Sequence, residues 1–128
     1  MERQHRGNRV VQINGVLGPI SPDDLGFTLM HEHVMVCASG LWESYPDLLG
    51  EDRDARAIAT LKKARDEGIA TIVDATTFDL GRNAPLLKTV AAGSGINIIN
   101  VTGWWLDVPR FLRGGGGFVL TFDEHFYK

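Results

Sequence analysis

The feature of the sequence that points most directly to chemistry is a pair of histidines separated by one residue. His31 and His33 belong to Phe27-Thr28-Leu29-Met30-His31-Glu32-His33-Val34, an apolar run rich in β-favouring residues. Side chains alternate between faces along a strand, so both histidines are expected on one face, about 6 to 7 Å apart, and Glu32 on the other. Two neutral imidazoles held in this way can bind one ion of zinc, nickel, cobalt or iron.

The spacing alone leaves a second interpretation open. A His-x-His pair also occurs as ordinary surface or core histidines, and a catalytic zinc site takes about three protein ligands. The run supplies two, His31 and His33. The pair therefore predicts either part of a metal site that other residues complete or two structural histidines.

The elements around the pair alternate between strands and helices. Strands are expected at 27–34, 69–76 and 96–102, and helices at 52–67 and 83–92. Gly68 is placed to follow the first helix, and Gly93 and Gly95 are expected to end the second. This order favours right-handed parallel βαβ units and therefore an α/β fold class.

The segments that flank these units are shorter and less regular. Residues 10–19 are expected to form a β-hairpin around Asn14-Gly15, because this dipeptide suits a tight turn. Ser21 and Pro22 predict a single helical turn, with Ser21 as its N-cap. Residues 1–9 are expected to be a disordered terminus. Residues 37–46 are a long connection without a clear period, which is typical of functional or disordered segments.

Composition excludes several classes of function. The chain has 128 residues and a formal charge of −3, which gives no electrostatic footprint for nucleic acid. It has one cysteine, Cys37, no apolar leader and no apolar run of about 18 residues, so a cytoplasmic protein without a membrane partner is expected. Dinucleotide-binding, P-loop and nucleophile-elbow motifs do not occur.

Polar and aromatic side chains follow the expected strands, at the edge of a parallel sheet where function collects. After the first strand these are His31 and His33; after the second, Asp74, Thr76, Thr77 and Asp79; after the third, Thr102, Trp104, Trp105 and Asp107. Taken alone, Asp74 is best interpreted as a carboxylate bonded to neighbouring backbone or hydroxyl groups, and the tryptophans as packing residues. Their clustering favours a site.

Three segments together resemble a known family. They are residues 18–34, the run Ile72-Val73-Asp74-Ala75-Thr76-Thr77-Phe78-Asp79-Leu80-Gly81-Arg82-Asn83, and Val101-Thr102-Gly103-Trp104-Trp105. In this order they are similar to the amino-terminal part of the phosphotriesterase family, which includes the phosphotriesterase-like lactonases and belongs to the amidohydrolase superfamily. The resemblance covers about residues 10–113.

The resemblance implies the amino-terminal portion of a (β/α)8 TIM barrel, with about three βα units and an N-terminal β-hairpin. It also implies a binuclear centre, usually zinc with cobalt, manganese or iron as alternatives, in which His31 and His33 bind the more buried metal. Trp105, with Trp104, would line the pocket for a small organophosphate triester or lactone, as in an aryldialkylphosphatase or lactonase. A homodimer is implied for the full-length family member.

The sequence also departs from the family. The family's other metal ligands, a bridging carboxylated lysine, two further histidines and an aspartate, have no counterpart here. No catalytic residue is therefore assigned. The Gly-rich segment 114–128 does not resemble the family, so a truncated, alternatively ended or frame-shifted product is expected, with an extra strand as the alternative.

Two hypotheses for function follow. One is a metal-dependent hydrolase of which this chain is an amino-terminal fragment. The other is a catalytically inactive short product that binds metal weakly or serves as an interaction partner.

Overall fold

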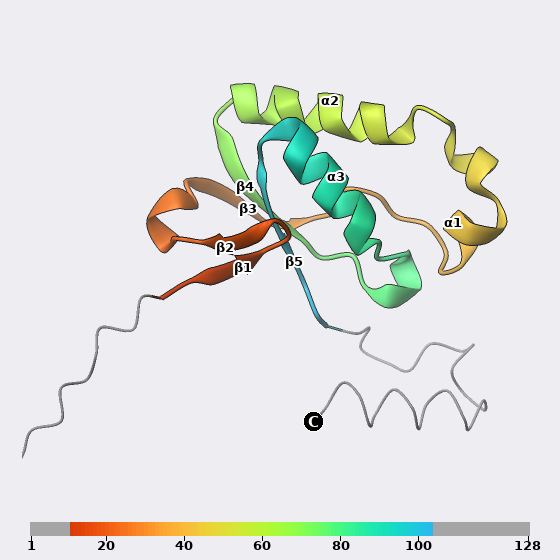
Figure 1. Ribbon diagram of the computed structural model, residues 1–128, viewed down its shortest axis with the longest axis horizontal. Coiled ribbons are helices and arrows are strands. Elements are labelled where there is room, and N and C mark those ends of the chain that lie inside the picture. Colours follow the sequence, from red (N-terminus) through yellow and green to blue (C-terminus); the bar gives the residue numbers. More distant parts are fainter. Residues whose placement is uncertain (1–10, 104–128) are drawn as a thin grey trace, which may run out of the picture.

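A parallel sheet of three strands lies at the centre of the chain (Figure 1). The computed structural model describes residues 11–103, and the strands are β3 (Phe27–Glu32), β4 (Ile69–Asp74) and β5 (Asn97–Asn100), in that order across the sheet. The helices α2 (Arg53–Asp66) and α3 (Ala84–Ser94) cross between them and cover the same face of the sheet. The predicted parallel α/β fold is confirmed. The segment after residue 103 lies outside the described residues, so the third of the expected βα units stays a prediction.

The strands β1 (Ile13–Gly15) and β2 (Gly18–Ile20) pair antiparallel, with Ile13 opposite Ile20. The turn between them is Val16-Leu17, so the predicted turn at Asn14-Gly15 is wrong by two residues. A tertiary contact accounts for the shift, because the Val16 amide donates a 2.8 Å hydrogen bond to the carbonyl of Ile98 in β5. This bond attaches the turn to the edge of the parallel sheet.

Residues 37–46 are more regular than the sequence indicated. They contain α1 (Leu41–Ser44) and lead into the 3-10 helix η2 (Pro46–Leu49). The cause is one aromatic residue: Trp42 is buried, and its indole N–H donates a 3.2 Å hydrogen bond to the carbonyl of Gly81. The guanidinium of Arg53 lies 4.5 Å from the indole ring centre. A single buried anchor of this kind leaves no period in the sequence.

Within residues 11–103 there are also two shorter 3-10 helices, η1 (Pro22–Asp24) and η3 (Phe78–Leu80). As predicted, Ser21 caps η1, and its hydroxyl oxygen accepts a hydrogen bond of 3.4 Å from the Asp23 amide. The η3 turn falls within the expected polar loop after β4. No helix within residues 11–103 is long and apolar enough to cross a membrane.

The ends of the long helices largely follow the sequence signals. Gly68, directly after the C-cap of α2, has φ +101°, and Gly95 ends α3 with φ +73°, conformations that glycine adopts at little cost. Asn83 caps the start of α3, where its side-chain oxygen accepts a 3.0 Å hydrogen bond from the Leu86 amide.

The expectation that Gly93 helps to end α3 is wrong, because Gly93 lies within the helix. It lies where α3 packs against α2. A Cβ atom at Gly93 would approach Cδ1 of Ile58 to 2.7 Å. The glycine therefore permits close contact between helices rather than termination of one.

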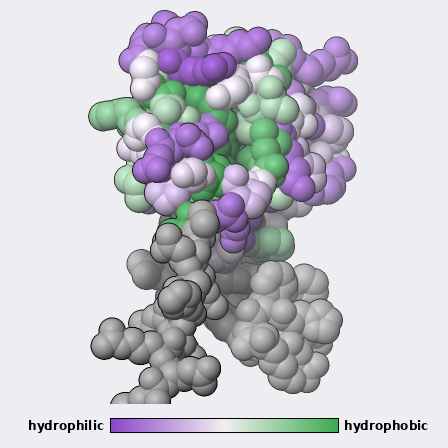
Figure 2. Space-filling view, turned by 60° about the vertical axis from the view of Figure 1, so that its left-hand side comes forward, coloured by the Kyte–Doolittle hydropathy of each residue, from purple (hydrophilic) through white to green (hydrophobic). Residues whose placement is uncertain are grey.

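The hydrophobic core lies between the sheet and the two helices. Its most buried side chains come from β4, α3 and β5, and are Ile72, Leu87, Val90, Ala91, Ile96 and Ile98. Apolar side chains also reach the surface, with Phe27 67% and Met30 72% exposed on β3. Figure 2 shows hydrophobic surface lying between hydrophilic residues on the face it presents.

The Gly93 contact leads to a test by substitution. Gly93→Ala is expected to lower the free energy of unfolding, because overpacking costs about 1 to 3 kcal/mol while alanine adds at most about 1 kcal/mol of helix propensity. Ile58→Ala removes Cδ1, Cγ1 and Cγ2, which would lie 2.7, 2.9 and 3.2 Å from the Cβ atom at position 93, so Gly93→Ala is expected to cost much less in the Ile58→Ala background. Urea unfolding gives the free energy of unfolding of the parent, the two single variants and the double variant. A Gly93→Ala chain more stable than the parent would contradict the packing argument.

Candidate metal centre

An irregularity in the pairing of β3 with β4 decides which way the histidines point. Leu29 pairs with Ile72 and Glu32 with Asp74, so three steps along β3 match two along β4. This extra residue places Leu29 and Glu32 on the same face of the sheet, the face covered by α2. His31, directly before Glu32, then falls on the opposite face.

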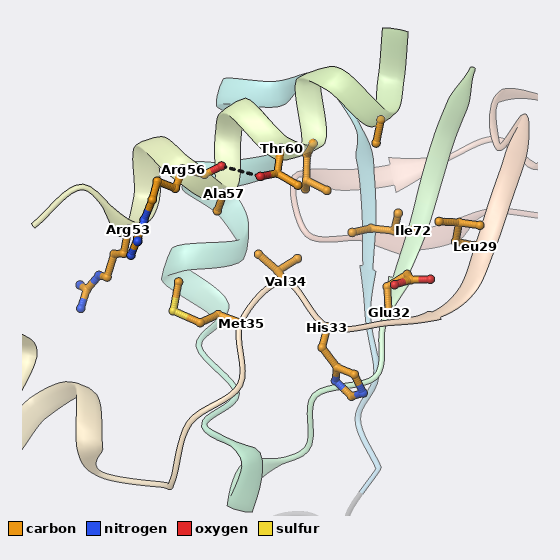
Figure 3. Close-up of a pocket in the computed structure, with 12 residues that line it drawn as sticks. Leu29, Glu32, His33, Val34, Met35, Arg53, Arg56, Ala57, Thr60 and Ile72 are labelled. Carbon is orange, nitrogen blue, oxygen red and sulfur yellow. Dashed lines mark hydrogen bonds between the residues drawn. The ribbon is translucent and has the colours of Figure 1, made fainter. Parts of the chain in front are cut away.

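The structure brings the two imidazoles together. His31 is the penultimate residue of β3 and His33 directly follows the strand; both are exposed. Their ring centres are 5.2 Å apart, with the planes at 72°. In Figure 3 the His33 ring points away from α2, whereas Val34 points toward it.

The donor set matches part of a metal site. Two accessible imidazoles on one side of a strand end are suitable ligands for a divalent metal such as zinc. Within residues 11–103, no group of three or more His, Cys, Asp or Glu side chains comes close enough to hold an ion. Among these residues, His31 and His33 could therefore supply two ligands to an ion but not a complete set.

His33 is held from the neighbouring strand. Its Nδ1 lies 3.1 Å from the hydroxyl oxygen of Thr76, two residues beyond the end of β4. Thr76 is 2% exposed, so its own position is fixed by the surrounding protein. The Ala75 amide also donates a 2.8 Å hydrogen bond to the Glu32 carbonyl, which continues the β3–β4 contact past the last strand residues.

Asp74 joins the same two strand ends with its side chain. It is 1% exposed, and its Oδ2 accepts a 2.9 Å hydrogen bond from the Val34 amide while Oδ1 accepts one of 2.9 Å from the Thr76 amide. The interpretation of Asp74 as a carboxylate bonded to neighbouring backbone is therefore confirmed. Its oxygens hold the backbone beside His33 and do not face a ligand.

Arg82 is a part of this arrangement that the sequence did not reveal. Its Nε donates a 3.0 Å hydrogen bond to the Thr76 carbonyl, and its Nη2 donates to the carbonyl of Gly103 beyond β5. Burial lowers the pKa of the guanidinium, and the charges of Asp74 and Asp79 oppose that shift. Arg82 thus links the segments after β4 and β5, a role visible only once the strands are adjacent.

Asn100, at the end of β5, was likewise not singled out from the sequence. Its Oδ1 is buried and has no hydrogen-bond partner among the residues that the structure describes. It pairs in register with Asp74. The expected pocket residues Trp104 and Trp105, and the segments 1–9 and 114–128, lie outside the described residues.

A groove begins beside the histidine pair, and His33 is among the residues that line it. It has a volume of about 410 Å³ between β3 and α2, and apolar side chains line most of it, including Leu29, Val34, Met35, Leu61 and Ile72 (Figure 3). The His33 ring points away from α2 although the residue lines the end of the groove, so a ligand shared with His31 is expected on the side of the strand that faces away from α2.

Comparison with known proteins places the chain in a family. The phosphotriesterase family profile matches residues 11–118. A "Phosphotriesterase homology protein" from Mycobacterium tuberculosis is 42% identical over 106 residues, covering 80% of this chain and 32% of that protein. An "Aryldialkylphosphatase" from Saccharolobus solfataricus is 38% identical over 95 residues, covering 72% of this chain and 30% of the relative.

A solved structure gives the same result at the level of the fold. The phosphotriesterase from Mycobacterium tuberculosis superimposes with a TM-score of 0.72 at 41% identity, covering 79% of this chain and 32% of that one. The fold of the chain therefore matches part of a phosphotriesterase barrel. The chain belongs to the phosphotriesterase family and spans about a third of the length of the curated relatives it matches.

Loss of the Asp74 charge tests the junction between β3 and β4. Asp74→Asn presents an amide N–H₂ to one of two backbone N–H donors, so one buried donor loses its partner at a cost of about 1 to 3 kcal/mol. Urea unfolding is expected to show that loss. Asp66→Asn, at an exposed position of α2, is the matched control and is expected to change stability by less than about 0.5 kcal/mol. Equal effects of both substitutions would argue against the assigned role.

Cys37 gives a prediction about pH. Burial raises the pKa of its thiol, the charge of Glu43 raises it further, and Arg53 opposes the shift. Because the thiolate is the reactive form, iodoacetamide is expected to modify the folded chain more slowly at pH 8 than the urea-unfolded chain, with the rate rising as pH increases. Glu43→Gln is expected to accelerate the reaction. Equal rates in the folded and unfolded chains would contradict the assignment.

Proposed function

We propose that the chain is part of a metal-dependent hydrolase that acts on organophosphate triesters or lactones, with His31 and His33 as zinc ligands. The observation that carries the proposal is the position of this pair. Two exposed imidazoles 5.2 Å apart lie at the carboxyl end of a parallel strand, in a chain of the phosphotriesterase family. In barrels of this architecture the catalytic groups come from that end of the strands.

The donor chemistry supports zinc, with cobalt, manganese or iron as alternatives. Imidazole suits all of these ions better than it suits magnesium or calcium. A catalytic zinc takes about three protein ligands, so the proposed site, which would hold two ions in a complete family member, draws its remaining ligands from outside residues 11–103. When bound, such an ion supplies hydroxide at neutral pH and polarises the oxygen of the bond to be cleaved.

The substrate class rests on the relatives and on the resemblance. The name of the Saccharolobus solfataricus protein, aryldialkylphosphatase, supports a phosphotriester. An "N-acetyltaurine hydrolase" from Salmo salar, 31% identical over 127 residues and covered for 36% of its length, supports hydrolysis as the broader reaction class. Lactones rest on the resemblance to the lactonases. Trp104 and Trp105 are proposed to line an apolar pocket for the small substrate.

The proposal is tested with the purified chain loaded with zinc or cobalt. Hydrolysis of a chromogenic aryl phosphotriester and of a lactone is measured beside metal binding by titration calorimetry. His31→Ala/His33→Ala is expected to abolish turnover and to weaken metal binding by at least about tenfold, since both donors are lost.

His5→Ala is the matched control, because it removes one imidazole elsewhere in the sequence and is expected to leave both readouts unchanged. Undiminished metal binding by the double variant would show that the pair is not the metal site. A folded, metal-loaded chain that hydrolyses neither substrate would contradict hydrolytic activity of this chain and favour the inactive product.

A further inference from the structure

The environment of His33 determines which ring nitrogen a ligand can reach. A neutral imidazole has one N–H donor and one acceptor nitrogen. Nδ1 of His33 is within hydrogen-bond distance of the Thr76 hydroxyl, at 3.1 Å. Nε2 is therefore the ring nitrogen left for a cation, and it can bind one only if it carries a lone pair rather than a hydrogen.

We propose that Thr76 is a positioning residue that holds His33 in the tautomer with hydrogen on Nδ1. In this arrangement the Nδ1–H donates to the Thr76 hydroxyl oxygen, and Nε2 presents its lone pair on the side of the strand shared with His31. The significance of this tautomer for metal binding rests on the proposed function. The choice of this tautomer rests on it too, because the Thr76 hydroxyl can donate to a bare Nδ1 as well as accept from Nδ1–H, and only the Nδ1–H form leaves the Nε2 lone pair for a metal.

The position of the Thr76 hydroxyl is fixed by bonds on both sides of its peptide backbone. The Thr76 amide donates to Oδ1 of Asp74 at 2.9 Å, and the Thr76 carbonyl accepts from Nε of Arg82 at 3.0 Å. With 2% of its surface exposed, the residue has no room to turn its side chain to solvent. The acceptor for His33 is thus held in place before any ligand arrives.

One carboxylate sets the distance between the two partners. Asp74 accepts hydrogen bonds from the Thr76 amide and from the amide of Val34, the residue directly after His33, each at 2.9 Å. These two hydrogen bonds of Asp74, together with the His33–Thr76 contact, form a closed ring of interactions between the two strand ends. Outer partners of this kind fix the tautomer and orientation of a ligating histidine, and their loss costs about 10-fold to 100-fold in metal affinity.

The direct test is the nitrogen-15 NMR spectrum of the histidine rings in the full 128-residue chain, without metal and well above the ordinary histidine pKa of about 6.5. His33, assigned by its loss in His33→Ala, is expected to carry hydrogen on Nδ1 in the parent and in Thr76→Ser. In Thr76→Val the hydroxyl is lost and the Nε2–H form is expected to gain population. Thr77→Val, which removes the hydroxyl that donates to Asp79, is the control and is expected to leave His33 unchanged.

An Nε2–H tautomer in the parent chain would overturn the proposal even if every variant failed to fold. An unchanged His33 spectrum in a folded Thr76→Val chain would overturn it as well. A zinc titration of the same proteins separates the two proposals. Failure of the parent to bind zinc would count against the proposed function, whereas the tautomer decides the role of Thr76. Where zinc binds, Thr76→Val is expected to weaken it by about 10-fold to 100-fold and Thr76→Ser to restore it.

Discussion

A buried carboxylate bonded to two backbone amides is the contact on which the geometry of the strand ends depends. Past the last ladder bonds, the amides of Val34 and Thr76 need acceptors, because an unpaired buried N–H costs free energy. Asp74 supplies both, with hydrogen bonds of 2.9 Å each. A nearly inaccessible charge is tolerated there because each of its oxygens is paired and Arg82 lies close enough to interact with it.

This contact links local chain geometry to the candidate site. The ladder between β3 and β4 fixes the relative height of the two strands, and Asp74 continues that connection into the segments after them. His33 and Thr76 are held against each other as a result. Arg82 extends the arrangement to the carbonyl of Gly103 beyond β5. The imidazoles therefore project from a bonded framework that spans all three strands, which keeps a site precise without large side-chain contacts.

The sequence predicted what depends on local pattern. Apolar periodicity located the three strands and both long helices, and Gly68 and Gly95 marked the ends of the two helices because the conformational freedom of glycine is intrinsic. Features set by distant partners could not be predicted. Val16 bonds to β5, Gly93 accommodates Ile58 on another helix, and Trp42 anchors to Gly81. In each case the deciding neighbour is far away in the sequence.

The residues of the candidate site fall into the same two groups, those that local pattern predicted and those whose role depends on distant partners. His31 and His33 were recognisable because one residue separates two imidazoles in an expected strand, and alternation alone placed them on a common face. The contacts of Arg82 and the position of Asn100 beside Asp74 depend on the order of the strands across the sheet, which sequence spacing does not specify. Their type gave no signal, since a lone arginine or asparagine in a loop or at a strand end is ordinary.

The extra residue in β3 has a consequence for how the sequence can vary in length. A strand tolerates substitution at most positions. Inserting or deleting one residue between Leu29 and Glu32, in contrast, moves every side chain on one side of that point to the opposite face of the sheet. Deletion of Met30 would remove the register shift between Leu29 and Glu32 and turn either the histidine pair toward α2 or Leu29 out of the core. Insertions and deletions should therefore be excluded from this short segment, even though Met30 itself is among the most exposed apolar residues of the described chain.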